Sequence, residues 1–369
     1  MDLIYFSPVP WNSYTQRPHE FVKYLAQSAA IKNILWVNPF PTRLPRINDL
    51  LRRPDLAPSK SDNKLPMLTV INVPCLPVEP LPILRQVNSF LWKRVKKQLL
   101  HFSSASSDHL MIAIGKPNRL GLWLLKNREA QINVYDRMDD FSHFYSGLSK
   151  LAMKSWEQQT VKRVNHVMVS ERHLALNISH LNSKITVVEN GYDMSSLPVP
   201  EKKNVASPQP VILGYAGSIA KWFDWELTIA LANNNPDCII RLIGPCFVNP
   251  PPLPNNIELR KACPREELIE QIKLFSIGII PFKNIPLSQG VDPIKFYEYR
   301  GLGKPVLSTR FGSMPEHAKH GGVVFFEETS LNECVSQSLN VTPTSTEVEA
   351  FRIANDWSTR FEKILPWLK

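Results

Sequence analysis

The sequence predicts an α/β fold with two domains, each built around a parallel sheet. Short apolar runs alternate with helical stretches through most of the chain, which is the pattern of βα units. At 369 residues the chain is too long for one ordinary core and suits two domains. Hydrophobic residues make up 43% and charged residues 21%, a balance that excludes a disordered or fibrous protein.

Seven apolar runs in the first half are expected to form the strands of one doubly wound sheet. They are Leu3 to Phe6, Ile34 to Asn38, Leu68 to Val73, Leu110 to Ile114, Ile132 to Tyr135, His166 to Ser170 and Ile185 to Val188. No basic segment precedes the first run, so we interpret it as a strand and not as a signal peptide. This interpretation places the protein in the cytoplasm.

A polar, proline-rich passage from Leu197 to Pro210 interrupts this rhythm and is interpreted as the linker between the domains. Six further runs predict a second sheet of similar build: Val211 to Ala216, Ile239 to Ile243, Ile257 to Leu259, Ile277 to Pro281, Pro305 to Ser308 and Val323 to Phe326. The predicted domains span residues 1–195 and 196–350. Residues 351–369 are expected to form a helix that crosses back to the first domain.

The positive charge lies in the first half of the chain. Residues 1–190 hold 25 Lys and Arg against 14 Asp and Glu, a net charge of +11, whereas the whole chain carries +10. This asymmetry indicates an anionic partner, either a phospholipid surface, a phosphorylated substrate or a nucleic acid. Nucleic acid is not expected, because no RRM, KH, zinc-finger or helix-turn-helix signature is present. The apolar runs are far shorter than the roughly 20 residues that span a bilayer.

A basic amphipathic helix is predicted from Leu84 to Phe102. Its apolar residues at helical spacing are Leu84, Val87, Leu91, Val95, Leu99 and Phe102, and its basic residues are Arg85, Lys93, Arg94, Lys96 and Lys97. Such a helix suits an anionic membrane surface. The alternative is a core-facing helix with a solvated basic side.

The most informative segment runs from Gln289 to Ser308 and reads as a loop, a short helix and a strand. Asp292 suits the N-cap and Pro293 the first helical position. Lys295 and Glu298 are three residues apart and share one helix face. A sugar nucleotide offers a pyrophosphate for Lys295 and a ribose diol for Glu298. An exposed ion pair between the two side chains would have the same spacing.

With its Asp-Pro start and its Gly-Leu-Gly-Lys-Pro-Val exit, this segment resembles the donor-binding motif of GT-B glycosyltransferases, specifically the family-four-like and GumK-like enzymes of bacterial polysaccharide assembly. The resemblance implies two Rossmann-like domains that face a cleft. It also implies a transferase that moves a sugar from a nucleotide-diphosphate donor to a saccharide acceptor, which we expect to be lipid-linked, at the inner face of the cell membrane.

The motif departs from the retaining members of that group at one position. They place a second acidic residue eight positions before the glutamate, where this chain has Gly290, and the departure favours inversion. No DxD motif follows a strand, and the five cysteines are widely spaced without a CxxC pair. We therefore expect no metal and no cofactor apart from the sugar-nucleotide substrate, and reduced, structural cysteines.

A second segment, from Val211 to Asp224, predicts a strand, a glycine turn and a helix. Gly217 lets the backbone approach a phosphate, Ser218 can donate a hydrogen bond and Lys221 can neutralise charge. The segment resembles the first βα turn of the GT-B donor domain, although such turns occur in any α/β protein. The resemblance also implies that backbone groups near Lys261 hold the base of the nucleotide.

Three carboxylates follow a predicted strand of the first domain, at the sheet edge where α/β proteins bind ligands. They belong to Asp136, Asp139 and Asp140. Crowded carboxylates raise the pKa of one another, which suits a base that deprotonates an acceptor hydroxyl. The resemblance implies an aspartate base here, with Asp139 or Asp140 preferred over Asp136. Capping of a helix and solvated turn positions are the alternative roles.

The first loop contains Gln16-Arg17-Pro18, which resembles a Gln-Arg-Pro segment that related polysaccharide transferases carry here, facing the cleft. Arg17 is a candidate for a bidentate contact with an acceptor or donor phosphate. His19 is a candidate acceptor-side residue or a residue that merely starts a helix. Three other functions fit the same fold and charge: a sugar-nucleotide epimerase, a scaffold without catalytic activity and a basic nucleic-acid-binding protein.

Overall fold

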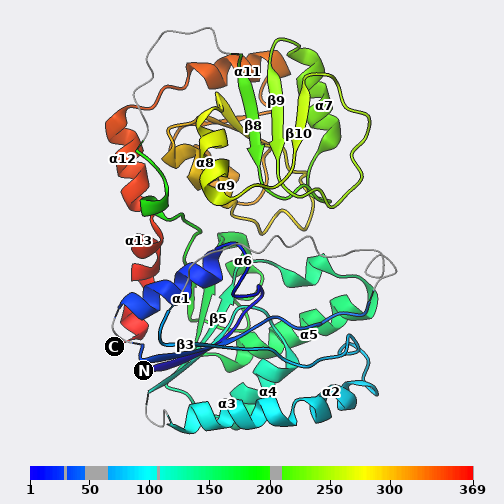
Figure 1. Cartoon of the computed structure of the whole chain (residues 1–369), viewed down its shortest axis with the longest axis vertical. Coiled ribbons are helices and arrows are strands. Elements are labelled where there is room, and N and C mark those ends of the chain that lie inside the picture. Colours follow the sequence, from blue (N-terminus) through cyan, green and yellow to red (C-terminus); the bar gives the residue numbers. More distant parts are fainter. Residues whose placement is uncertain (29–30, 46–64, 106–108, 200–209, 369) are drawn as a thin grey trace. The chain divides into compact units, whose positions relative to one another are not determined.

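The computed structural model describes residues 1–28, 31–45, 65–105, 109–199 and 210–368. The chain divides into two compact units, of which the first contains Met1–Val188 with Phe361–Lys369 and the second contains Glu189–Arg360. Each unit holds one sheet and its helices (Figure 1). All five cysteines are free thiols.

The sheet of the first unit has seven parallel strands in the order β3-β2-β1-β4-β5-β6-β7. The strands are β1 (Asp2–Phe6), β2 (Asn33–Val37), β3 (Leu68–Ile71), β4 (Leu110–Ile114), β5 (Ile132–Arg137), β6 (His166–Val169) and β7 (Ile185–Val187). The order reverses direction at β1 and β4, as in a doubly wound sheet. All seven predicted strands of this half are confirmed, with bounds that differ by at most two residues.

The helices of the first unit are α1 (Arg17–Gln27), α2 (Arg85–Leu91), α3 (Lys93–Ala105), α4 (Arg119–Asn127), α5 (Gly147–Arg163) and α6 (Arg172–Leu176), with a 3-10 turn, η2 (Phe141–Phe144). Figure 1 shows α3 and α4 on one face of the sheet and α1 on the other. The inner strands β2, β1, β4, β5 and β6 are largely buried, which explains why they appear in the sequence as nearly unbroken apolar runs, whereas the edge strands β3 and β7 are partly exposed.

The predicted single helix from Leu84 to Phe102 is wrong, because the chain breaks at Trp92 into α2 and α3. The indole of Trp92 is buried and lies edge-on to Phe40, at 5.8 Å between ring centroids. The side chain of Asn88 is also buried and bonds to both backbone groups of Leu76. These anchors turn α2 so that Val87, on the predicted apolar stripe, is exposed.

The sheet of the second unit has six parallel strands in the order β10-β9-β8-β11-β12-β13. They are β8 (Ile212–Ala216), β9 (Ile239–Ile243), β10 (Ile257–Arg260), β11 (Ile277–Ile280), β12 (Val306–Ser308) and β13 (Val323–Phe325). The predicted strands of this half are confirmed too. Its helices are α7 (Trp225–Asn234), α8 (Arg265–Lys273), α9 (Ile294–Gly301), α10 (Met314–Ala318), α11 (Leu331–Asn340) and α12 (Ser345–Ala354), with the 3-10 turn η3 (Met194–Ser196).

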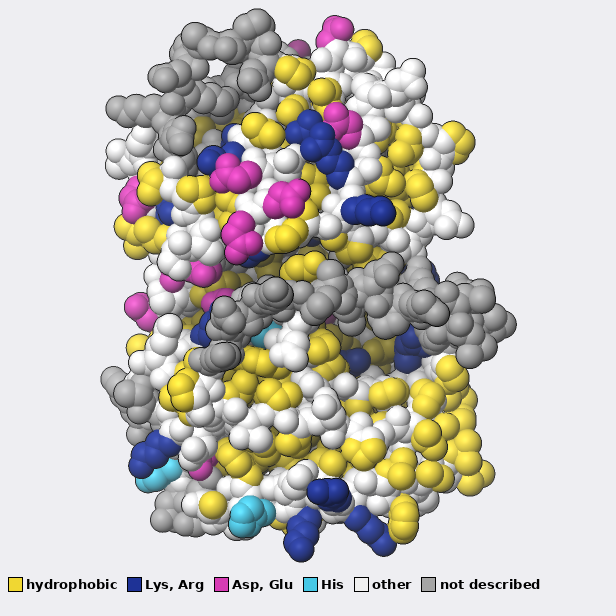
Figure 2. Space-filling model, viewed as in Figure 1, with side chains coloured by type: hydrophobic (Ala, Val, Ile, Leu, Met, Phe, Trp, Pro, Cys, Tyr) yellow, Lys and Arg dark blue, Asp and Glu magenta, His cyan; other side chains and the backbone are white. Residues whose placement is uncertain are grey.

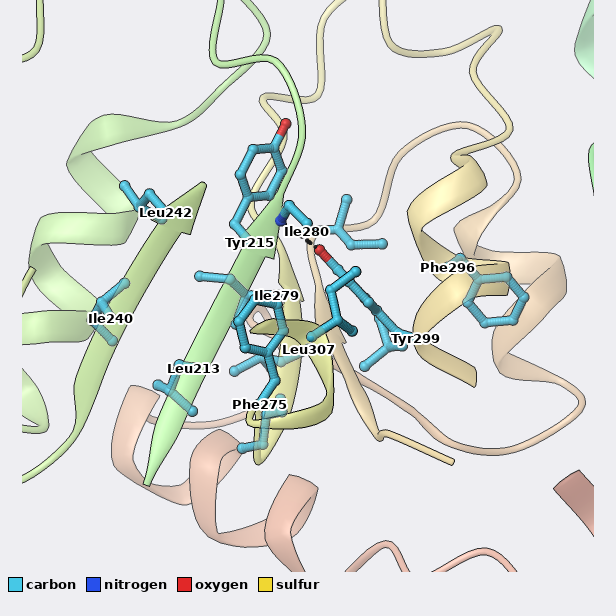
Figure 3. Close-up of a cluster of buried hydrophobic side chains, with 14 of the residues drawn as sticks. Leu213, Tyr215, Ile240, Leu242, Phe275, Ile279, Ile280, Phe296, Tyr299 and Leu307 are labelled. Carbon is cyan, nitrogen blue, oxygen red and sulfur yellow. Dashed lines mark hydrogen bonds between the residues drawn. The ribbon is translucent and has the colours of Figure 1, made fainter. Parts of the chain in front are cut away.

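Tyr299 anchors helix α9 to the sheet of the second unit. Its ring fills the space above Gly278 of β11, where an added Cβ would lie 2.2 Å from the ring. Its hydroxyl oxygen accepts a hydrogen bond of 2.8 Å from the amide of Ala216, at the end of β8. Figure 3 shows Tyr299 reaching from α9 into the cluster that contains Ile279 and Leu307. The position of α9 is therefore set by close packing on a glycine and by one buried hydrogen bond.

The chain re-enters the first unit at Phe361. The crossing helix was expected to start earlier, at residue 351. Helix α12 belongs to the second unit, because the Arg352 guanidinium is buried and donates to the carbonyls of Gly301 and Leu197. The short helix α13 (Trp357–Phe361) and the 3-10 turn η4 (Glu362–Trp367) complete the chain. Along the chain, the boundary between the units falls between residues 188 and 189. Part of the expected linker, residues 200–209, lies outside the described residues.

Candidate functional site

The side chain of Lys295 lies against the glycine turn that follows β8. Gly217 has a φ of 147°, and a Cβ at this position would lie 2.2 Å from Cε and 2.6 Å from Nζ of Lys295. The ammonium also lies over two rings, with Nζ 5.2 Å from the Tyr215 centroid and 5.6 Å from the Phe282 centroid. Two segments that the sequence places far apart, at residues 217 and 295, are therefore in direct contact.

The Lys295 ammonium has no carboxylate within 4 Å in the part of the chain that the structure describes. Burial lowers its pKa to about 8, and the nearby charge of Glu298 only partly opposes this shift. The alternative of an ion pair between these two side chains is wrong, because Glu298 pairs with another residue. A partly desolvated cation beside a glycine backbone at the carboxyl edge of a parallel sheet suits a bound anion.

Glu298 is largely buried, and its Oε1 accepts a hydrogen bond of 2.8 Å from Arg265, the first residue of α8. The same guanidinium reaches Ser196 Oγ at 3.4 Å. An ionised carboxylate offers about four acceptor positions. The pair with Arg265 thus orients Glu298 and leaves acceptor capacity for further hydroxyl groups. Sequence reasoning missed Arg265, because nothing in the spacing links α8 to α9.

Asp292 does not have the predicted position at the start of α9, because Pro293 is the N-cap residue and no side chain caps this helix. The Asp292 carboxylate is buried and fully engaged. Its partners are the Asn190 amide at 2.6 Å, Tyr297 Oη at 2.8 Å, Ser313 Oγ at 2.8 Å and His317 Nε2 at 2.7 Å. Burial alone would raise its pKa, but these hydrogen bonds lower it. Asp292 therefore holds the loop before α9 in place, and the predicted contact with the donor is not supported.

The other predicted donor residues lie at the same edge of the sheet. Ser218 is partly exposed beside Gly217, and its carbonyl accepts a bond of 2.7 Å from Tyr215 Oη. Lys221 and Lys261 are exposed, in the loops that follow β8 and β10. Sequence reasoning missed Gly244, after β9, where a Cβ would lie 2.3 Å from the Gly217 carbonyl oxygen. A glycine directly after a strand was the available signal for this close approach.

In the first unit, Asp136 is buried in an ion pair. Its Oδ1 accepts a bond of 2.9 Å from Arg17 Nε, and Tyr5 Oη donates to Oδ2 at 3.2 Å. Arg17 Nη1 donates to the Val188 carbonyl at 2.7 Å. The guanidinium is thus committed to the protein at two nitrogens, and the predicted bidentate contact with a phosphate is not supported. Both carboxylate oxygens of Asp136 are therefore occupied by side chains of the protein itself.

His19 is buried and shapes the first loop. Its Nδ1 accepts a bond of 3.1 Å from the Gln16 amide, while Nε2 lies 3.2 Å from the Pro10 carbonyl and 3.1 Å from that of Trp11. Burial lowers its pKa, although the bonds to backbone oppose that shift. A neutral ring with a proton on Nε2 satisfies all three contacts. The role of starting the helix is supported over the acceptor-side role.

Asp140 caps the 3-10 turn η2. Its Oδ1 accepts bonds from Ser142, at 3.1 Å from the amide and 2.7 Å from the hydroxyl. Its Oδ2 lies 3.5 Å from Arg137 Nη2 and 3.2 Å from His143 Nδ1. Burial would raise its pKa, but these partners lower it. Asp140 is accordingly held as an anion and is a poor base.

Asp139 differs from both of its neighbours. Within the described residues it makes no hydrogen bond and no ion pair, and its side chain is partly exposed. Burial first and then the charge of Asp140 raise its pKa to about 7, while Arg137 and Arg17 partly oppose the shift. A carboxylate with this pKa, at the carboxyl edge of a parallel sheet, is suited to proton transfer near neutral pH. The structure thus separates the three aspartates by their surroundings.

Among the residues that the structure describes, no group of three or more His, Cys, Asp or Glu could hold a metal ion. No helix in the described ranges is long and apolar enough to cross a bilayer.

No protein-family model matches the chain. It is 28% identical over 208 residues to TuaH of Bacillus subtilis (strain 168), provisionally assigned as a teichuronic acid biosynthesis glycosyltransferase. The match covers 50% of this chain and 52% of TuaH, so it spans about half the length of that relative.

Solved structures match over nearly the whole chain. Sucrose-phosphate synthase from Thermosynechococcus elongatus is 11% identical, with a TM-score of 0.67 over 99% of this chain and 97% of that one. The lipopolysaccharide outer core galactosyltransferase WaaB is 10% identical, with a TM-score of 0.59 over 98% of each chain. An α,α-trehalose-phosphate synthase from Burkholderia vietnamiensis is 11% identical, with a TM-score of 0.61 over 100% and 96%. The predicted GT-B fold of two Rossmann-like domains and the resemblance to GT-B glycosyltransferases are confirmed.

The titration of Asp139 tests the distinction between the aspartates. We expect its carboxyl resonance, assigned in a carbon-13 NMR titration through its loss in Asp139→Asn, to titrate with a midpoint near pH 7. The folded state then holds the proton longer than the unfolded state, so stability falls as pH rises from about 4 to 7. Asp139→Asn should therefore raise the Tm above pH 7 and leave it nearly unchanged at pH 4.

The matched control is Asp140→Asn, which removes a cap and an anion from the same turn. It should lower the Tm at neutral pH and shift the Asp139 midpoint downward. An Asp139 midpoint below pH 5 in the wild-type protein would refute the assignment.

Proposed function

We propose that this chain is a glycosyltransferase that moves a sugar from a nucleotide-diphosphate donor to a saccharide acceptor in cell-surface polysaccharide synthesis. The observation that carries the proposal is the contact between the Lys295 ammonium and Gly217, with Glu298 on the same helix and no carboxylate pairing with Lys295 in the described part of the chain. Similarity to TuaH, whose name refers to teichuronic acid biosynthesis, supports the polysaccharide context.

In the donor site, Lys295 and the turn at Gly217 bind the diphosphate. Glu298 accepts hydrogen bonds from the ribose hydroxyls, while Arg265 keeps its carboxylate in place. Exposed Lys221 and Ser218 add charge and a hydroxyl donor beside the same turn, and the loop at Lys261 lies near the base. As the bond between sugar and diphosphate breaks, the negative charge that develops on the leaving oxygen is stabilised by Lys295. This mechanism needs no metal ion.

Asp139 acts as the general base. It removes the proton of the acceptor hydroxyl, whose oxygen attacks the anomeric carbon of the donor sugar, and the nucleotide diphosphate leaves with the electron pair of the broken bond. Attack opposite to the leaving group inverts the anomeric configuration. The raised pKa of Asp139 and its lack of a partner in the described residues support it over Asp136, which pairs with Arg17, and over Asp140, which accepts a bond from Ser142.

The acceptor in this proposal is lipid-linked, and the protein binds peripherally to the inner face of the cell membrane. The support comes from α2 and the residues before it, where Ile83 is 86% exposed, Phe90 is 65% exposed, and Leu84 and Val87 are also exposed. Hydrophobic side chains gather at the edge where α2 lies, with Lys and Arg side chains along the bottom near α3 (Figure 2). Apolar side chains beside cations suit an anionic lipid surface.

A thermal-shift screen against UDP, GDP, CMP, ADP and dTDP tests the donor site. We expect one nucleotide to raise the Tm, because a ligand that binds only the folded state stabilises it. Glu298→Ala removes charge-assisted hydrogen bonds and should weaken that binding about tenfold or more. Glu270→Ala, which removes an exposed glutamate from α8, is the control and should bind like the wild type. If no nucleotide shifts the Tm, the chain is not a sugar-nucleotide transferase.

Asp139→Asn should bind the selected nucleotide normally and lose about 100-fold or more in turnover, since general-base catalysis contributes roughly that factor. Turnover is measured as transfer of labelled sugar from the corresponding sugar nucleotide to a bacterial lipid extract. The control, Asp237→Asn, changes an exposed carboxylate of the second unit. Unchanged transfer by Asp139→Asn would remove it as the base, whereas nucleotide release without any acceptor would favour an epimerase.

Membrane binding is tested by sedimentation with vesicles of phosphatidylglycerol and phosphatidylcholine. The double variant Ile83→Ser, Phe90→Ser should lose most of its binding, because two exposed apolar side chains no longer enter the lipid. Leu176→Ser alters a residue of α6 that is 72% exposed and should bind normally. Equal sedimentation of all three proteins would contradict the assignment of α2 as the membrane contact.

A further inference from the structure

A second group of hydrogen-bond donors lies at the carboxyl edge of the first unit's sheet. Strands β4 and β5 are parallel neighbours in register, with Ile114 opposite Tyr135. Lys116 is the second residue after β4, just as Asp139 is the second residue after β5. Neighbouring parallel strands end at the same edge of a sheet. Lys116 and the proposed base therefore belong to the same edge.

Lys116 is partly buried, and its ammonium lies over the ring of Tyr145, with Nζ 5.6 Å from the centroid. No carboxylate lies within 4 Å of it in the described residues. This sets Lys116 apart from two buried or partly buried cations of the same unit, because Arg17 pairs with Asp136 and Arg119 pairs with Glu79. A partly buried cation without an anionic partner leaves its charge available to an anionic ligand.

The lowered pKa of Tyr145 indicates a positive electrostatic potential around its hydroxyl group. Burial alone would raise the pKa of a tyrosine, yet the pKa of Tyr145 is lowered by Lys116 first, then by the Thr42 hydroxyl and the charge of Arg43. These groups come from three separate segments: the loop after β2, the turn after β4 and the residue after η2. Such convergence stabilises negative charge on whichever oxygen lies among them.

The buried hydroxyl group of Thr42 is a separate indication that this cluster binds a ligand. Its side chain is 4% exposed, and Oγ1 has no hydrogen-bond partner of good geometry among the described residues. The segment is fixed nearby, where the Leu44 amide donates to Ser149 Oγ at 3.0 Å. The Thr42 hydroxyl lies close enough to Tyr145 to lower the pKa of that side chain, but it forms no well-aligned hydrogen bond there. A buried hydroxyl without a well-formed hydrogen bond costs free energy that a ligand oxygen can recover. The hydroxyl therefore points to a ligand that completes the cluster.

We propose that Lys116, Thr42, Tyr145 and Arg43 form a subsite for a phosphate or diphosphate group of the acceptor substrate. Two cations supply more positive charge than a single carboxylate balances, whereas a phosphate group carries a larger negative charge and at least three oxygens that can accept bonds from the two hydroxyl groups. The subsite holds the acceptor at the sheet edge that also carries Asp139. This inference rests on the proposed function, since it defines the chemical class of the acceptor.

Isothermal titration with inorganic pyrophosphate tests the subsite without any need for turnover. We expect two sites on the wild-type protein, one dependent on Lys295 and one dependent on Lys116. Lys116→Met and Lys295→Met should each retain a single site, and the double variant none. Tyr145→Phe keeps the ring and should weaken the second site several-fold. Lys126→Met, which removes an exposed cation from α4, should retain both sites.

Two sites that persist in Lys116→Met, or a wild-type protein with only the Lys295-dependent site, would overturn the inference. A wild-type protein that shows only the Lys116-dependent site would instead count against the donor site. Farnesyl diphosphate then distinguishes the sources of the phosphate. Binding that is tighter than for pyrophosphate and still depends on Lys116 supports a lipid-linked acceptor, and equal binding with the same dependence supports a water-soluble phosphorylated one.

Discussion

The packing of Tyr299 on Gly278 determines the geometry of the candidate donor site. The ring occupies the space that any larger residue of β11 would fill, and its oxygen receives the Ala216 amide from β8. Both contacts fix α9 relative to the central strands of the second sheet. Because Lys295 and Glu298 extend from the same short helix, they inherit this fixed position. A preorganised cation of this kind loses little free energy to rearrangement when a diphosphate binds.

The first unit uses charge in a different way, because the three aspartates at the carboxyl end of β5 differ in their partners. Asp136 is neutralised by Arg17 in the core, and Asp140 is held as an anion by Ser142 and Arg137. Asp139, with neither kind of partner in the described residues, remains the carboxylate that can exchange a proton near neutral pH. Three aspartates within five positions thus acquire different chemistry from their surroundings alone.

The strands were predictable because parallel strands covered on both faces appear as short, nearly unbroken apolar runs. The donor segment was predictable in part, because Lys295 and Glu298 are three residues apart and residues at this spacing share one face of a helix. The partners that decide the roles were not predictable, because Arg265, Asn190 and His317 are distant in sequence. Asp292 has the expected pattern of an N-cap and yet serves a buried network. The break at Trp92 was not predictable, because the apolar residues keep a continuous helical spacing through it. The break comes from the tertiary packing of the buried Trp92 side chain.

The most direct test of the central claim is proton uptake when a nucleoside diphosphate binds. With a pKa of about 8, roughly half of the Lys295 side chains are neutral at pH 8, and contact with a diphosphate should restore their protons. Titration calorimetry at pH 8 in buffers of different ionisation enthalpy should therefore report an uptake of about half a proton per nucleotide, absent in Lys295→Met. Tight nucleotide binding without proton uptake, or with the same uptake in Lys295→Met, would show that the diphosphate binds elsewhere.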